Sequence, residues 1–278
     1  MCQFCHTHGE GEKWYLNAKN YSGDLLSDLR RRKFIKDFFR DPESLGDDLM
    51  QMEKLDKAPP FVRRAISWHI TRKMKKNHFG QVVPIEDIER IFDFMGSIVR
   101  VACICRNTTL GSEHRYCYGI SLSPDGGPMR DIIREVSPTF MTGPHTGGLE
   151  VLTRDEALEA FRHHESEGLC HTVWTFVAPF IGGICNCDRT DCMAMRAQLA
   201  HEIPVMFRAE YEAEINLDLC NGCRSCMRLC QFGAISYSPS RKKSMIDLKR
   251  CYGCGVCRAG CVKDAISLRE RAAIPAIQ

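Results

Sequence analysis

The residues best suited to chemistry in this sequence are its cysteines, of which the 278 residues contain 17. An odd number of cysteines cannot all pair as disulfides, and a chain of this length can bury a core without disulfide cross-links. Thiolates are also the ligands that iron–sulfur clusters and zinc prefer. The cysteine usage therefore predicts bound metal in a reducing compartment.

Eight of these cysteines form a doubled motif toward the C-terminal end. The spacing C-x2-C-x2-C-x3-C occurs first from Cys220 to Cys230 and again, 31 residues later, from Cys251 to Cys261. The match extends to Ala234-Ile235-Ser236 and Ala265-Ile266-Ser267, which follow the two motifs. A repeat of this kind indicates two similar structural halves.

The spacing also predicts how the thiolates divide between two clusters. Three closely spaced cysteines wrap one cluster, whereas the fourth is carried away by the helical turn after them and ligates the other cluster. The predicted sets are Cys220, Cys223, Cys226 and Cys261 for one [4Fe–4S] cluster, and Cys251, Cys254, Cys257 and Cys230 for the second. Gly222 and Gly253 are expected to let backbone amides approach cluster sulfur. Zinc also suits C-x2-C pairs, but eight cysteines with this doubled spacing do not divide simply into zinc sites.

Through this doubled motif, residues 211–270 resemble the bacterial two-[4Fe–4S] ferredoxin family. The resemblance implies a two-fold ferredoxin-like domain that carries single electrons. Members of that family usually have proline after the fourth cysteine of each motif, where this sequence has Gln231 and Val262. The departure bears on loop rigidity and reduction potential.

Nine cysteines lie outside the motif, and six of them form tight groups. If a strand ending at Cys105 meets a loop at Cys185, these six could bind a third iron–sulfur cluster or zinc; they are Cys103, Cys105, Cys117, Cys185, Cys187 and Cys192. Cys170, on a predicted strand, is expected to be a structural core residue. The arrangement Cys-x-Cys-Arg, then Gly168–His171, then Ile-Cys-Asn-Cys resembles uncharacterised ferredoxin-type proteins of anaerobic bacteria. That resemblance implies architecture and not a reaction.

A last group of ligand-type residues lies at the N-terminus. Cys2-Gln-Phe-Cys5-His6 has the spacing of a c-type haem attachment site, but haem attachment follows export and the sequence shows no export signal. Cys2, Cys5, His6 and His8 are instead a candidate small metal site, or ligands of a cluster shared with a partner chain, with a flexible tail as the alternative.

The elements that must position these residues indicate an α+β chain. Its predicted parts are a basic helical region at 1–80, a mixed α/β cysteine-rich domain at 81–208, a dicluster ferredoxin domain at 209–270 and a tail at 271–278. Three helices are expected between Tyr21 and Asn77, with breaks at Pro42 and Pro59-Pro60. Further helices are expected from Pro84 to about Gly96, after the capping box at Thr153, and after Cys192; strands are expected at 98–105, 116–121 and 170–178; a loop is expected at 126–128.

The distribution of charge and the absence of certain motifs limit the classes of function that fit the sequence. Between Lys13 and Phe79 there are 16 Lys and Arg against nine Asp and Glu, so the basic charge of the chain gathers there. We expect an acidic redox partner to dock on this basic helical region, and no nucleic-acid partner, because no helix-turn-helix spacing occurs. The sequence has no Walker loop, no G-x-G-x-x-G motif and no radical-SAM motif. No apolar stretch is long enough to span a membrane, so a cytoplasmic protein is expected.

The sequence thus predicts an electron-transfer protein or redox subunit of an oxidoreductase complex in an anaerobe. It relays single electrons through two [4Fe–4S] clusters, with a third cluster or zinc possible in the middle domain. One alternative is an oxidoreductase with a substrate bound at an open cluster in the middle domain. The other is a redox-sensing regulator. Whether the chain is an enzyme stays open, and no catalytic residue is assigned.

Overall fold

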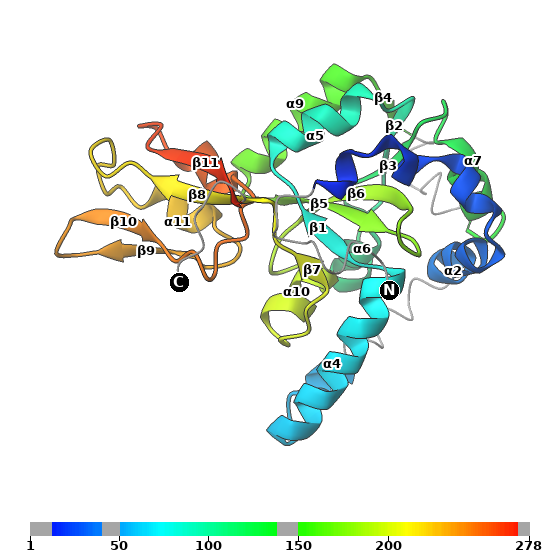
Figure 1. Cartoon of the computed structure of the whole chain (residues 1–278), viewed down its shortest axis with the longest axis horizontal. Coiled ribbons are helices and arrows are strands. Elements are labelled where there is room, and N and C mark those ends of the chain that lie inside the picture. The colour runs from blue at the N-terminus through cyan, green and yellow to red at the C-terminus, as the bar shows by residue number, and fades with distance from the viewer. Residues whose placement is uncertain (1–12, 41–50, 138–149, 272–278) are drawn as a thin grey trace.

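The computed structural model describes residues 13–40, 51–137 and 150–271. In this part of the chain a seven-stranded sheet with helices on both faces occupies one side of the molecule, and two small two-stranded sheets occupy the other (Figure 1). The fold is therefore mixed α and β. None of the described helices is both long enough and apolar enough to cross a membrane.

The large sheet is mostly antiparallel. Its strands are β1 (Gly80–Val82), β2 (Ser97–Val101), β3 (Cys117–Ser121), β4 (Glu150–Leu152), β5 (Cys170–Thr175), β6 (Ile181–Cys187) and β7 (Met206–Phe207). They lie in the order β4-β2-β3-β6-β5-β1-β7, and the edge pair β1 and β7 is parallel. The central strands β3, β6 and β5 all carry cysteines, so the sheet itself brings distant cysteines together.

Helices α5 (Ile85–Asp93) and α9 (Arg154–Ser166) cover one face of the sheet (Figure 1). The buried rings of Phe92 and Phe161 meet between them, with ring centroids 5.2 Å apart. The predicted capping box is confirmed, because the backbone N–H of Glu156 donates to the Thr153 hydroxyl and the backbone N–H of Thr153 donates to the Glu156 carboxylate. The helix expected from Pro84 is also confirmed as α5.

The opposite face carries the cavity described below and five helices. These are α2 (Leu29–Arg40), α4 (Pro60–Asn77), α6 (Ile104–Leu110), α7 (Gly127–Arg134) and α10 (Met193–Leu199). Residues 51–55 are also helical. Helix α4 begins at Pro60 as predicted, whereas the predicted break at Pro42 lies outside the described residues. Ahead of α2 the chain forms three 3₁₀ turns, η1 (Trp14–Leu16), η2 (Ala18–Tyr21) and η3 (Gly23–Ser27), where a regular helix was expected from Tyr21.

Two other expectations for this region are wrong. Residues 126–128 are not a loop but the start of α7, because Gly126 adopts a left-handed conformation at the N-cap and Pro128 fits the first turn. The strand expected through Cys105 ends at Val101. Cys103 is the N-cap of α6 and Cys105 lies inside that helix, which Gly111 ends in a left-handed conformation.

The C-terminal part has an internal two-fold pattern. Strand β8 (Tyr211–Ile215) pairs with β11 (Ile266–Glu270), and β9 (Ile235–Ser238) pairs with β10 (Lys243–Ile246). The strand ahead of each cysteine motif thus pairs with the strand after the other motif. The short helices α11 (Ser225–Leu229) and η4 (Val256–Gly260) occupy equivalent places inside the two motifs.

Candidate metal centres

The first predicted cysteine set lines one small cavity in the C-terminal part. Cys220, Cys223, Cys226 and Cys261 all border it. Cys226 lies on α11, close enough to the other three thiols to interact with them electrostatically. The fourth cysteine therefore does come from the other half of the repeat, as the spacing predicts.

The second predicted set gathers around Cys257 in η4. Its thiol interacts electrostatically with those of Cys254, Cys251 and Cys230, and also with Cys226 of the first set. The two sets are therefore neighbours. Burial raises the pKa of Cys257, Cys251 and Cys230, so these groups need a positive centre to ionise.

Backbone amides donate to the fourth cysteine of each motif in the same way. The N–H of Ala234 donates to the Cys230 sulfur at 3.2 Å, and the N–H of Ala265 donates to the Cys261 sulfur at 3.3 Å. These two alanines are the equivalent residues of the repeated Ala-Ile-Ser segment. Donors to sulfur suit anionic cluster ligands, which such hydrogen bonds stabilise.

The two motif glycines also allow a close approach of backbone, and the backbone N–H of Gly253 donates to the Cys251 sulfur at 3.4 Å. Gly222 and Gly253 have φ of +71° and +68°, a conformation that side chains disfavour. A Cβ at Gly222 would collide with the carbonyl oxygen of Lys242, and one at Gly253 would collide with that of Tyr211. The glycines thus allow the motif loops to pass close to neighbouring backbone.

Gln231, where the resembling family usually has proline, joins the C-terminal part to the large sheet. Its side-chain amide donates to the carbonyl of Gly168 at 2.7 Å, and its side-chain oxygen accepts from the backbone N–H of Arg189 at 3.1 Å. Val262, at the second such place, is 82% exposed.

The six middle cysteines also come together. Cys117 of β3 faces Cys185 of β6 in register, and Cys192 is the N-cap of α10. Through their side chains, Cys117 interacts with Cys103 and Cys185, and Cys192 interacts with Cys105 and Cys187. Cys185 lies on a strand and not on the predicted loop, because β6 continues to Cys187 at the centre of the sheet.

The surroundings of this set suit negatively charged sulfur. The Cys103 sulfur accepts a backbone hydrogen bond from Tyr116 at 2.9 Å and one from the Arg106 guanidinium at 3.7 Å. Arg106 is buried and forms an ion pair with Asp188. Burial alone would lower the pKa of Arg106, but the neighbouring Cys103 and Asp188 outweigh it and raise that pKa. Burial raises the pKa of Cys103 well above its usual range.

Within the three described ranges, no three His, Cys, Asp or Glu side chains converge closely enough to hold a single metal ion. This absence includes the eight motif cysteines. A four-iron cluster separates its ligand sulfurs more widely than one ion does. Cys2, Cys5, His6 and His8 lie outside the described residues.

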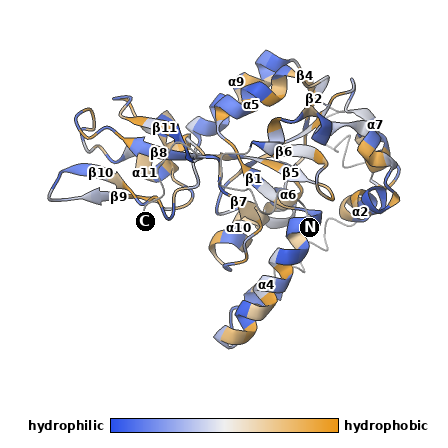
Figure 2. Ribbon diagram, in the orientation of Figure 1, coloured by the Kyte–Doolittle hydropathy of each residue, from blue (hydrophilic) through white to orange (hydrophobic). Residues whose placement is uncertain are grey.

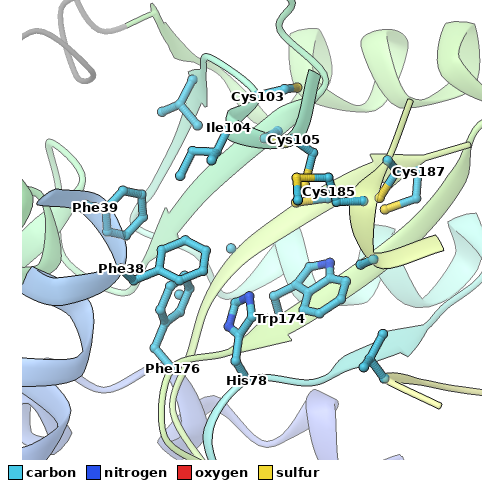
Figure 3. Close-up of a pocket in the computed structure, with 18 of the residues that line it drawn as sticks. Phe38, Phe39, His78, Cys103, Ile104, Cys105, Trp174, Phe176, Cys185 and Cys187 are labelled. Atoms are coloured by element: carbon cyan, nitrogen blue, oxygen red, sulfur yellow. The ribbon is translucent and has the colours of Figure 1, made fainter. Parts of the chain in front are cut away.

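A cavity of about 780 Å³ lies beside the six cysteines. Figure 3 shows Phe38, Phe176, His78 and Trp174 at one end and Cys105, Cys185 and Cys187 at the other. The His78 ring lies against the Trp174 ring, with centroids 4.9 Å apart, and burial lowers the pKa of His78 to about 4. The histidine is therefore neutral near pH 7. Sequence reasoning missed this site, because its walls come from short, separate segments.

Two further buried histidines, His164 and His171, have structural roles. His164 is buried and shares a hydrogen bond of 2.8 Å with the Tyr118 hydroxyl. His171 is fully buried and bonds Asn186 through Nδ1. Cys170 is fully buried in a core with Cys187 and Cys192, as expected of a core cysteine.

Comparison with known proteins agrees with the C-terminal geometry. A family model described as a 4Fe-4S dicluster domain matches residues 219–266. The indolepyruvate oxidoreductase subunit IorA of Pyrococcus abyssi is 38% identical over 52 residues, which are 19% of this chain and 8% of that protein. The chain thus spans a small fraction of this relative. Residues 219–266 form a 4Fe–4S dicluster ferredoxin domain, joined here to a mixed α/β region with its own cysteine set.

Proposed function

We propose that this protein is an iron–sulfur electron-transfer protein that relays single electrons through two [4Fe–4S] clusters. Cys220, Cys223, Cys226 and Cys261 hold one cluster, and Cys230, Cys251, Cys254 and Cys257 hold the other. The observation that carries the proposal is that both sets gather with their fourth cysteine crossing from the other half of the repeat. When bound, each cluster accepts and releases one electron.

A third iron–sulfur cluster in the middle region extends this relay. Six buried or half-buried thiols meet there, a backbone N–H and a guanidinium donate to one of them, and the site adjoins the dicluster domain. These are features that stabilise an anionic cluster. Six thiols exceed the four that one closed cluster uses, and we place Cys117 and Cys185, which face each other in register on β3 and β6, among those four.

The electrons are exchanged with a partner protein. The name of the Pyrococcus relative describes a subunit of an oxidoreductase, which is the kind of assembly that a dicluster domain serves. We infer that the partner docks on the basic helical region, chiefly on α4. That helix has no buried residue and projects away from the sheet (Figures 1 and 2).

Iron and acid-labile sulfide per chain, measured on anaerobically purified protein with zinc assayed on the same sample, test the proposal. About twelve irons are expected for three four-iron clusters. The double variant C117A/C185A should retain about eight, and C226A/C261A should lose the cluster of the first set. The matched control M193L changes a buried neighbour of Cys192 at nearly constant volume and should keep all the iron.

The outcomes separate the parts of the proposal. About eight irons in the wild type, unchanged in C117A/C185A, would remove the third cluster and leave the dicluster relay. Far fewer than eight irons in intact anaerobic protein would overturn the proposed function.

The cavity supports a second candidate function, an oxidoreductase that reduces or oxidises a bound molecule at the middle cluster. A volume of about 780 Å³ is within the range of small-molecule sites, and the cysteines form one of its walls. An iron that is open to this cavity should bind cyanide, seen as a change in the electron paramagnetic resonance (EPR) signal that is absent in C117A/C185A. An unchanged signal in the wild type would reject this second function.

A further inference from the structure

The sheet face that carries Cys117 and Cys185 has a bare patch beside these two cysteines. Gly119 of β3 pairs with Gly183 of β6, and each glycine lies two residues from one of the cysteines, on the same side of its strand. Both strands are central in the sheet, yet both glycines are partly exposed and line the cavity. The pair, called here the glycine floor, is therefore a stretch of cavity wall without side chains.

The space above the glycine floor is open. A Cβ at Gly119 would meet only the carbonyl oxygen of Val99, 4.0 Å away, and one at Gly183 would meet only that of Tyr118, 3.3 Å away. Neither glycine has a positive φ, so the backbone conformation does not require glycine at these positions. Glycine inside a strand often marks the close approach of a ligand, and here the open space is consistent with that role.

The Trp174 ring forms one edge of this open space. Trp174 of β5 pairs with Gly183 on one side and with Gly80 of β1 on the other. Its ring lies over Gly80, where an added Cβ would come within 2.8 Å of a ring carbon. The indole N–H donates to the Thr172 hydroxyl at 2.8 Å, which fixes the ring. The ring therefore leans toward β1 and leaves Gly183 uncovered.

His78 supplies a polar atom at the Trp174 end of the cavity (Figure 3). Its ring packs against those of Trp174, Phe38 and Phe176, and its Nδ1 lies 2.6 Å from the carbonyl oxygen of Thr175. A carbonyl only accepts, so Nδ1 carries the hydrogen and Nε2 of the neutral ring is an acceptor. Within the described part of the chain, Nε2 has no hydrogen-bond partner, so it is available to a donor on a bound molecule.

We propose that the cavity binds a planar aromatic molecule, which lies flat on the glycine floor and donates a hydrogen bond from a hydroxyl or ring N–H to His78 Nε2. A flat ring fits a surface that has no side chains, and the aromatic walls add ring contacts. The other end of the floor is formed by Cys117 and Cys185, about 7 Å along the strands from the glycines. The inference rests on the second function proposed above, because it names the class of molecule that lies beside the middle cluster.

Equilibrium dialysis of three probes against anaerobic, cluster-loaded, full-length protein tests the site. 2-Naphthol is planar and carries a donor, naphthalene is planar without a donor, and decahydro-2-naphthol carries the same hydroxyl on thicker, saturated rings. The dissociation constant should be lowest for 2-naphthol and about tenfold higher for each of the other two. Naphthalene lacks the hydrogen bond, and decahydro-2-naphthol lacks the flat contact.

Variants of the floor and of the acceptor locate the binding. G119V places a side chain on the floor, in a strand that accommodates valine, and should raise the dissociation constant of 2-naphthol at least about tenfold. The milder G119A should raise it less. H78F keeps a ring but removes the acceptor, so it should weaken 2-naphthol about tenfold and leave naphthalene unchanged.

The matched control is I184V. Ile184 follows Gly183 on β6, but its side chain is buried in the core on the opposite face of the sheet. Binding of all three probes should be unchanged in this variant. The inference would be overturned by no binding of 2-naphthol, by equal binding of 2-naphthol and decahydro-2-naphthol, or by unchanged binding in both G119V and G119A. An equal loss of 2-naphthol and naphthalene binding in H78F would likewise reject the hydrogen bond.

Iron analysis of the same samples separates this failure from failure of the proposed function. About twelve irons with no preference for 2-naphthol would reject only the class of ligand. About eight irons with the expected order of binding would remove the middle cluster and keep the aromatic site.

Discussion

Arg106 is a buried cation whose guanidinium contacts a sulfur, a carboxylate and a backbone carbonyl. Its guanidinium donates to Cys103, to the carbonyl of Asn186 and to Asp188, and it lies over the Tyr116 ring. A buried charge pair is stable only while both partners are present. Arg106 therefore links the stability of the sheet to the charge of the middle cysteine set.

The variant R106L should lose about 3 kcal/mol of stability, because it leaves Asp188 buried without its partner. The control R154L removes an ion pair with Asp93 on the surface, where both side chains are largely exposed, and should cost at most about 1 kcal/mol. Urea unfolding midpoints of anaerobic protein measure the difference. Equal midpoints for the two variants would show that the buried ion pair contributes no more stability than the exposed one.

His164 gives the stability a pH dependence. Burial lowers its pKa to about 3, whereas the unfolded residue titrates near pH 6.5. Below pH 6.5 the unfolded state therefore binds a proton that the folded state does not bind. The free energy of unfolding consequently falls as the pH falls. Above pH 6.5 both states are neutral and the effect vanishes.

Between pH 6.5 and 5, His164 should cost the wild type about 2 kcal/mol of stability. The variant H164Q keeps an acceptor for the Tyr118 hydroxyl and removes the titration, so its urea midpoint should change less over this interval. The measurement is the urea midpoint of both proteins at the two pH values. Parallel changes would exclude His164 as the source.

At the scale of elements, the basic residues of α2 and α4 have different roles, although both helices belong to the region that was expected to dock the partner. Arg31 of α2 is buried and bonds the carbonyls of Phe176 and Val177, so part of the Arg30–Lys33 run holds the helix to the sheet. On α4 the exposed Trp68 ring lies 5.3 Å from the Arg72 guanidinium. Exposed aromatic and cationic groups on one projecting helix fit a docking surface for an acidic protein.

Charge reversal on α4 should therefore slow electron exchange with an acidic redox protein. With reduced flavodoxin as the probe in stopped-flow measurements, R72E/K76E should lower the second-order rate about tenfold at low salt, and the difference should shrink as salt screens the charges. The matched reversal R130E/R134E on α7 should have little effect. Equal slowing by both variants would indicate net charge alone and would remove α4 as the docking surface.

At the scale of the whole molecule, the two dicluster sites differ in protection. Cys223 of the first set is exposed, and Leu219 beside that set is 52% exposed. Cys251 and Cys257 of the second set are buried, and the second set faces the sheet. Solvent access is one of the properties that govern cluster chemistry.

On exposure to air, the cluster of the first set should decay several-fold faster than the cluster of the second set. The decay of the two EPR signals, with the first identified by the C223S variant, measures the order, and an anaerobic sample is the control. If the second set decayed first, the protection of that site by the sheet would be refuted.

The sequence by itself determined the C-terminal part in detail. The repeat spacing predicted two equivalent halves and the gathering of each four-cysteine set, because ligand spacing is a local property of a tight loop and one helical turn. Local rules also predicted the capping box of α9 and the start of α5. The division of the chain at residues 80 and 208 stays a prediction.

Only the tertiary structure decided the middle region. Cys103 and Cys105 belong to a helix and Cys185 to a strand, and they meet because β3, β6 and β5 are neighbours in the sheet. Strand order depends on long-range pairing, which no local pattern in one sequence encodes. The cavity walls have the same origin: they join segments far apart in the chain, so packing alone creates them.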